Sequence, residues 1–154
     1  MIYTELTNKA LRIAYEAHAG QLDKCGIPYV FHLAHLAEQM DDEASTCVAL
    51  LHDTVEDSDM TLEDLACDFP PEVVEGVRLL THDPAVGYLD YVRAIKGHPI
   101  AEKVKLADLR HNSDETRFAG CPGVSAEDLE RRRAKYAAAR EILLGAPDAG
   151  NPPA

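Results

Sequence analysis

Leu50-Leu51-His52-Asp53-Thr54-Val55-Glu56-Asp57 is the stretch that decides the fold expected for this chain. An imidazole and a carboxylate stand side by side at the end of an apolar helical run, and two more carboxylates follow within one turn. Ionisable side chains grouped so closely are costly to bury without a cation, because each charge loses its water on burial. The stretch therefore predicts a metal site at the end of a helix, with a solvated acidic loop as the alternative.

Two further polar residues stand inside apolar segments and are the expected partners of such a site. His32 closes the segment Gly26-Ile27-Pro28-Tyr29-Val30-Phe31-His32, and Asp108 lies in Val104-Lys105-Leu106-Ala107-Asp108-Leu109-Arg110-His111-Asn112. Two imidazoles and two carboxylates without a thiolate suit Mn²⁺, Fe²⁺ or Zn²⁺, and two open positions on an octahedral ion favour Mn²⁺. The predicted ligands of this divalent metal are His32, His52, Asp53 and Asp108.

The order of these motifs resembles that of the HD-domain metal-dependent phosphohydrolases: a histidine, then His52-Asp53 with Glu56-Asp57 behind it, then an aspartate. Within that superfamily, the phrases around His52 and from Lys105 to Asn112 are most similar to the alarmone hydrolase domain of the RelA/SpoT family and its small stand-alone relatives. The resemblance covers roughly residues 11–117. It implies an all-α fold, the HD-domain helical bundle, and release of the 3′-pyrophosphate from guanosine tetra- or pentaphosphate.

The resemblance also implies roles for the two carboxylates behind the metal ligands. Glu56 lies one helical turn beyond His52 and Asp57 one turn beyond Asp53, provided that the helix persists, so that both face a metal-bound water. We expect Glu56 to act as the general base or to orient the water, and Asp57 to assist it. The ion itself lowers the pKa of bound water and neutralises charge at the phosphoryl group.

The candidates for binding the substrate are Lys24, Lys105, Arg110 and Asn112. Lys24 matches the basic residue that alarmone hydrolases carry before their Pro-Tyr-x-x-His segment, and Asn112 matches the asparagine four residues after the last metal ligand. The family usually shows Arg-Lys in the first loop, whereas this chain has Asp23-Lys24, and Leu33 follows His32 where proline is usual. In the family, the missing arginine contacts the nucleotide base. The resemblance therefore supports guanine recognition less strongly than it supports metal binding.

Two other functions are compatible with the sequence. The first is an HD phosphohydrolase acting on another nucleotide or a small phosphate ester, which the missing arginine favours. The second is a catalytically silent module that binds a nucleotide or a partner protein. Glu56 and Asp57 argue against the silent module, because a protein that keeps only the fold has no use for such costly charges.

Apolar residues recur at three- and four-residue spacing through nearly the whole chain, which predicts helices and no sheet. Thr61 with Asp64, and Ser125 with Asp128, resemble capping boxes that open helices. The expected helices cover about 6–17, 32–40, 44–51, a short segment from 61, 71–80, 88–95, 99–111 and 125–144.

A chain of 154 residues fits one domain with a substantial core. We assign the HD-type domain to residues 1–145 and expect 146–154, rich in Pro, Gly and Ala, to be a disordered tail. The formal net charge of −12 argues against binding of nucleic acid or an anionic membrane surface, since both attract basic proteins. A nucleotide substrate therefore needs a bound cation and a local group of Lys and Arg side chains.

The cysteines form no CxxC pair and are expected as free thiols in a reduced, cytoplasmic protein: Cys25, Cys47, Cys67 and Cys121. The first five residues do not begin a basic region followed by an apolar stretch, and no run of about 18 apolar residues occurs. We therefore expect a chain that is neither exported nor membrane-spanning.

Several other polar residues lack a motif of their own. His18, His35 and His111 are expected as helix-surface or core side chains without a direct functional role. The run Arg131-Arg132-Arg133 covers several faces of its helix, which is typical of a solvated surface and not of a phosphate clamp.

Overall fold

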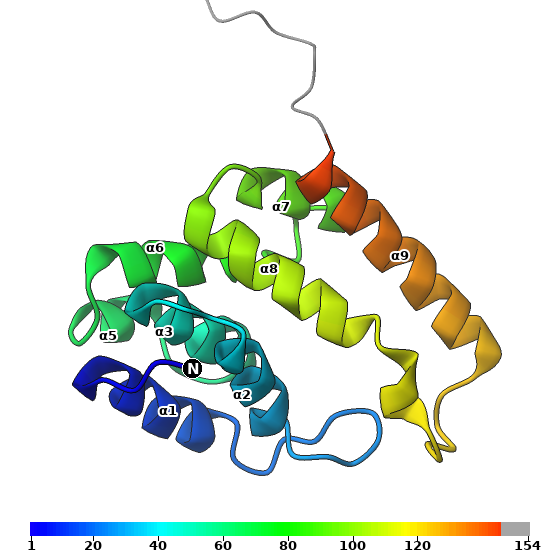
Figure 1. Ribbon diagram of the computed structural model, residues 1–154, viewed down its shortest axis with the longest axis horizontal. Helices are drawn as coiled ribbons and strands as arrows, with labels where there is room; N and C mark the ends of the chain where they lie inside the picture. Colours follow the sequence, from blue (N-terminus) through cyan, green and yellow to red (C-terminus); the bar gives the residue numbers. More distant parts are fainter. Residues whose placement is uncertain (146–154) are drawn as a thin grey trace, which may run out of the picture.

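The computed structural model describes residues 1–145, and their regular structure is helical (Figure 1). Strand-like pairing in this part of the chain is an isolated bridge between Leu22 and Pro28. The all-α fold predicted from the periodicity is confirmed. The predicted tail, 146–154, lies outside the described residues. Among the described helices, none combines the length and the apolarity that a bilayer span requires.

The helices begin and end close to the predicted positions. The capping boxes at Thr61 and Ser125 are both present, and α2 begins at Val30, two residues before the expected start. The elements are α1 Glu5–Ala17, α2 Val30–Glu38, α3 Glu43–Leu51, α4 Thr54–Asp57, α5 Leu62–Ala66, α6 Pro71–Leu80, α7 Tyr88–Ile95, α8 Pro99–Asn112, the 3₁₀ helix η1 Glu115–Phe118, and α9 Ala126–Leu144.

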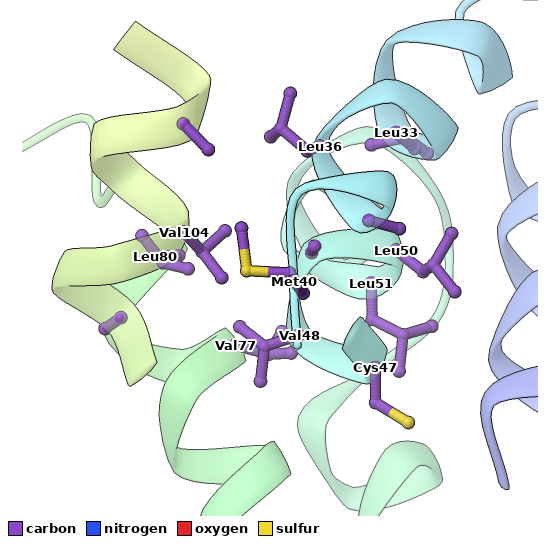
Figure 2. Packing of buried hydrophobic residues seen from close by; sticks show 14 of the residues in the cluster. Leu33, Leu36, Met40, Cys47, Val48, Leu50, Leu51, Val77, Leu80 and Val104 are labelled. Atoms are coloured by element: carbon purple, nitrogen blue, oxygen red, sulfur yellow. The ribbon is translucent and has the colours of Figure 1, made fainter. Parts of the chain in front are cut away.

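Helix α3 is the centre of the core. Its residues 45–51 are all buried, because α1, α2, α6 and α8 pack around it. Figure 2 shows Val48, Val77 and Val104 converging between α3, α6 and α8. A Cβ atom at Gly76 would lie 2.8 Å from Cγ2 of Val48, so only glycine permits this close crossing of α6 over α3. The C-terminal end of α3 therefore emerges from a rigid core.

Helix α3 ends where the apolar run predicted, and it does not persist beyond His52 to carry Glu56 and Asp57. His52 is the C-cap of α3, and Asp53 is the N-cap of the one-turn helix α4. The backbone N–H of Asp57 donates to the carbonyl of Asp53 over 3.0 Å, which closes that single turn. Glu56 and Asp57 are consequently oriented by α4 and not by an extension of α3.

Two loops meet at one end of the bundle, the segment after α1 and the segment between η1 and α9 (Figure 1). Cys25 in the first and Cys121 in the second form a disulfide, so the prediction of four free thiols was wrong for this pair. The two cysteines are 96 positions apart, and a spacing of that length carries no pairing signal in a single sequence. Cys47 and Cys67 are free, as predicted.

Candidate metal centre

Three of the predicted metal ligands converge where α2, α3 and α4 meet. His32, His52 and Asp53 each offer one ligand atom, and these atoms lie within 4.8 Å of one another. Asp108, on α8, adjoins the group through His32, with its Oδ1 3.2 Å from Nε2 of that ring. Nε2 of His52 lies 3.1 Å from Oδ2 of Asp53. The fold thus brings together residues that stand up to 76 positions apart in the chain.

Both histidine rings are oriented so that Nε2 is available to a cation. Nδ1 of His52 donates to the carbonyl of Ala49 over 2.8 Å, and Nδ1 of His32 lies 2.6 Å from Nδ1 of His111. Burial and the Arg117 guanidinium lower the pKa of His111 to about 4, so that ring is neutral and its Nδ1 accepts a hydrogen bond from the Nδ1–H of His32. Nε2 of His32 and of His52 are buried and lack a hydrogen-bond partner within residues 1–145. This donor set fits a divalent metal, since a ligating histidine holds its other nitrogen in such a bond.

The carboxylates of the centre are fixed by hydrogen bonds from neutral and charged donors. The Tyr29 hydroxyl donates to Oδ2 of Asp53, and burial together with that carboxylate raises the pKa of Tyr29, which keeps it a donor. Nζ of Lys105 donates to Oδ2 of Asp108 over 2.9 Å, and Nδ2 of Asn112 donates to Oδ1 over 2.7 Å. Burial opposes ionisation of Asp108, but Lys105, His32 and His52 together outweigh burial and hold the pKa of that carboxyl well below its usual range.

The electrostatic balance of the centre favours a bound positive charge. Burial disfavours the charged form of His52, yet the carboxylates of Asp53 and Asp108 outweigh burial and raise the pKa of His52 to about 9. The ring therefore takes up a proton when no other cation is close. A metal ion satisfies the same two carboxylates and replaces that proton.

Glu56 and Asp57 lie beside this centre on α4. The carboxylate of Glu56 accepts from the backbone N–H of His82. Burial, and then the nearby Asp53, raise the pKa of Asp57, and burial likewise raises the pKa of Glu56. A carboxylate with a raised pKa is a better proton acceptor near neutral pH than an ordinary one.

The structure separates the four predicted substrate residues into three groups. Lys105 and Asn112 bind the carboxylate of Asp108, so they hold a predicted metal ligand in place. Arg110 is exposed and donates to Oε1 of Gln39 over 2.9 Å. It lies two residues from Asp108 along α8, so its side chain points to another side of that helix. Lys24 is exposed and lines a surface pocket, which agrees with a role in binding an anion.

That pocket has a volume of about 200 Å³, and the sequence analysis missed most of its residues. Arg132 was expected to be solvated; instead it is half-buried, with its guanidinium carbon 5.0 Å from the ring centroid of Phe118 and 5.2 Å from that of Tyr136. The four-residue spacing of Arg132 and Tyr136 is the signal that indicates this pairing. The pocket is lined by Lys24, Asp128, Arg131, Arg132, Lys135 and Tyr136.

A second pocket, of about 340 Å³, opens directly beside the metal centre because His32 forms part of its wall. Arg117 from η1 donates to the carbonyl of His111 over 2.9 Å and lies 3.5 Å from Oδ2 of Asp23. An arginine thus reaches the first loop from another element, although the loop itself lacks one. The pocket is lined by Asp23, Ile27, Pro28, Phe31, His32, His35, His111 and Arg117.

His18 and Gln21 form a brace that the sequence analysis also missed. Nδ1 of His18 lies 2.8 Å from Oε1 of Gln21, and Nε2 of Gln21 donates to the carbonyl of Asp57 over 2.8 Å. The ring of His18 is buried and packs 5.3 Å from that of Tyr29, measured between centroids. The brace ties the end of α1 to the one-turn helix that carries Glu56.

Comparison with known proteins gives relatives but no matching family model. A protein named probable GTP pyrophosphokinase, from Mycobacterium leprae, is 35% identical over 126 residues, which cover 73% of this chain and 16% of that protein. One named guanosine-3′,5′-bis(diphosphate) 3′-pyrophosphohydrolase, from Aquifex aeolicus, is 33% identical over 122 residues, or 71% of this chain and 18% of its own length. The chain therefore spans less than a fifth of these relatives.

A solved structure resembles the fold over nearly its whole extent. It is described as a metazoan orthologue of SpoT that hydrolyses ppGpp and plays a role in starvation responses. The TM-score is 0.80 and the identity 25%, and the match covers 96% of this chain and 90% of that one. The helical bundle expected from the HD-domain resemblance is thereby confirmed.

Proposed function

We propose, from the relation of this chain to the RelA/SpoT family in sequence and in fold, that it is a metal-dependent phosphohydrolase of guanosine tetra- or pentaphosphate. It would remove the pyrophosphate group from the 3′ position. The observation that carries the proposal is the pair of buried Nε2 atoms on His32 and His52, each turned to Asp53 or Asp108 with its Nδ1 hydrogen-bonded elsewhere. The relatives that are pyrophosphohydrolases of guanosine-3′,5′-bis(diphosphate) by name supply the substrate class.

His32, His52, Asp53 and Asp108 would hold the divalent metal, for which we propose Mn²⁺ over Fe²⁺ or Zn²⁺ because the ligands are nitrogen and oxygen donors and an octahedral ion keeps open positions. When bound, the ion lowers the pKa of its water, polarises the phosphoryl group and neutralises developing charge. Lys105 and Asn112 keep the Asp108 carboxylate in place for this task.

The residues of α4 handle the proton. Glu56 would accept the proton of the attacking water, whose oxygen forms a bond to phosphorus while the bond from phosphorus to the 3′ oxygen breaks. The 3′ oxygen leaves with the nucleoside and takes up a proton, which restores the 3′ hydroxyl. Asp57 holds the water from its other side. The raised pKa of both carboxyls supports these roles, because proton transfer is most efficient when the pKa of the base approaches the working pH.

The two pockets would hold the ends of the nucleotide. Lys24, Arg132 and Lys135 present cations that bind phosphate groups, and they locally overcome the net charge of −12. Arg117 offers a planar guanidinium on the side of the other pocket, where a base can stack on it. The partner is thus a small-molecule nucleotide.

We also propose a cytoplasmic location, since Cys67 is an exposed free thiol and such thiols persist in reducing compartments. A second candidate function is hydrolysis of another nucleotide or small phosphate ester. Asp23 favours it, because a carboxylate stands where relatives carry a cation for the base.

A screen of metals against substrates tests the proposal. Purified protein is stripped with chelator, reloaded with Mn²⁺, Fe²⁺, Zn²⁺ or Mg²⁺, and given guanosine and adenosine 3′-pyrophosphates, nucleoside triphosphates and a generic phosphodiester, with products resolved by chromatography. We expect metal-dependent release of pyrophosphate from the guanosine alarmones. Asp53→Asn is the matched control and should be inactive with every metal. Cleavage of simple nucleotides alone would replace the proposal with the second candidate function.

A further inference from the structure

The disulfide between Cys25 and Cys121 joins the two loops that together build the substrate pockets. Its Cα atoms are 5.3 Å apart, a usual separation for two bonded cysteines. Cys25 follows Lys24 directly, and Cys121 lies in the short segment between η1 and α9. Both cysteines are partly exposed, so small thiol reagents can reach them.

Each pocket takes residues from both sides of this crosslink. The pocket beside the metal centre combines Asp23 of the first loop with Arg117 of η1. The basic pocket combines Lys24 of the same loop with Arg132 and Lys135 of α9. The geometry of both pockets therefore depends on how closely the two loops are held.

The ion pair between the first loop and η1 is weak compared with the covalent disulfide. The ion pair of Arg117 and Asp23 spans 3.5 Å and is partly open to solvent. Pairs of this kind contribute little to stability. Asp23 is otherwise occupied within its own loop, where its Oδ1 accepts from the backbone N–H groups of Cys25 and Ile27.

We propose that Cys25 and Cys121 are a reversible oxidation site, and that the disulfide sets the affinity of the enzyme for its substrate. The inference rests on the proposed function, whose substrate pockets it would control. Oxidation holds Lys24 against α9 and Asp23 against η1, which preorganises both pockets. Reduction frees the loops and weakens binding, while the metal centre on α2, α3 and α8 stays intact. Disulfides in reducing compartments are usually of this transient, sensing kind.

The chemistry is thiol–disulfide exchange with a low-molecular-weight disulfide. The thiolate of one cysteine attacks a sulfur of the reagent, whose sulfur–sulfur bond breaks and releases one small thiol. The second cysteine then attacks the mixed disulfide, forms the protein bond and releases the second small thiol. The protein loses two electrons and two protons, and the reagent gains them; a small thiol reductant reverses every step.

The test equilibrates the Mn²⁺-loaded, full-length chain in glutathione buffers of graded redox poise. Alkylation after denaturation, read by mass, should find two free thiols in the oxidised form and four in the reduced form. Reduction should raise KM for guanosine tetraphosphate by roughly 5- to 150-fold, the usual range of coupling between two sites. The turnover number should change little. Cys25→Ser and Cys121→Ser should show the high KM in every buffer, while Cys67→Ser, with an exposed thiol outside the crosslink, should respond as the unmodified chain does.

A readout without substrate separates this inference from the proposed function. Hydrogen exchange of segments 21–29 and 119–125 should quicken on reduction in the unmodified chain, but not in Cys25→Ser. If this change occurs while no alarmone is cleaved, the crosslink still controls the loops and the proposed function fails alone. Four alkylated thiols in every buffer would overturn the inference. So would hydrogen exchange rates and a KM that are the same in the oxidised and the reduced protein.

Discussion

The candidate metal centre and the proposed substrate rim, meaning the first loop, η1 and the part of α9 that line the two pockets, are held in place by different means. At the centre, His52 ends a fully buried helix, and its ring is turned by a backbone carbonyl of that same helix. At the rim, Lys24 comes from a loop and Arg117 from the short 3₁₀ helix η1. The disulfide of Cys25 with Cys121 and the ion pair of Arg117 with Asp23 connect these two segments. The centre is therefore fixed by the core, whereas the rim is adjustable.

This difference predicts that the two regions tolerate substitution to different degrees. A substitution at the centre disturbs packed helices and buried charges together, so few changes are tolerated. A substitution at the rim, such as the Asp23 that stands in place of an arginine, alters only contacts in a loop. Chemistry and specificity are thus separable here, and the four variants below test that separation.

Asp108→Ala should have the largest effect. It removes a metal ligand and leaves the buried Lys105 ammonium without its partner, so the free energy of unfolding should fall by about 3–5 kcal/mol. Metal content by elemental analysis and activity should both fall sharply. The double variant Asp108→Ala/Lys105→Met removes the orphaned charge; urea denaturation should show recovered stability while the metal remains lost. Full metal occupancy in Asp108→Ala would remove Asp108 from the ligand set.

Glu56→Gln should separate chemistry from metal binding at the centre. The amide keeps the shape but accepts no proton, so turnover should fall roughly 10²- to 10⁴-fold with metal content unchanged. Because burial raises the pKa of Glu56 above its ordinary 4.5, the rate of the unmodified enzyme should decline on acidification from a point above that pH. This decline of the rate at low pH should be absent in Glu56→Gln. A normal rate in Glu56→Gln would transfer the role to Asp57.

Arg132→Ala should affect the rim alone. Losing a charged phosphate contact costs about 1.5–3 kcal/mol, so KM should rise roughly 10- to 100-fold with the turnover number nearly constant. Arg140→Ala, on an exposed position of the same helix outside the pocket, is the matched control and should behave as the unmodified enzyme. A fall in turnover without a change in KM would place Arg132 at the chemical step instead.

Asp23→Asn should produce the smallest change. The amide oxygen can still accept from the loop N–H groups, while the negative charge beside a polyanionic ligand disappears. Catalytic efficiency on guanosine and adenosine 3′-pyrophosphates should rise about two- to fivefold, as expected for one charge acting through solvent. An unchanged efficiency on both compounds would mean that Asp23 does not face the ligand.

The helices were predicted from local patterns, whereas the meeting of His32, His52 and Asp53 was predicted from the order of motifs that the HD-domain resemblance supplies. His52-Asp53 and the capping box at Thr61 carry their signals within a few residues. The end of α3 near His52 was predicted from the apolar run, but the separate one-turn helix α4 was not, since its N-cap Asp53 is held by Tyr29 from another segment. The disulfide of Cys25 and the basic pocket around Arg132 arise from segments far apart in the chain, and periodicity does not report such distances.

The one-turn helix α4 has a consequence for how the protein fails under stress. Four residues cannot sustain a helix by themselves, because the nucleation cost exceeds what a single turn returns. The segment bearing Glu56 depends on the Gln21 side chain bound to the carbonyl of Asp57, whereas α3 is secured on every side. Warming or mild urea should therefore open α4 as a local unit before the domain unfolds, so that inactivation precedes denaturation.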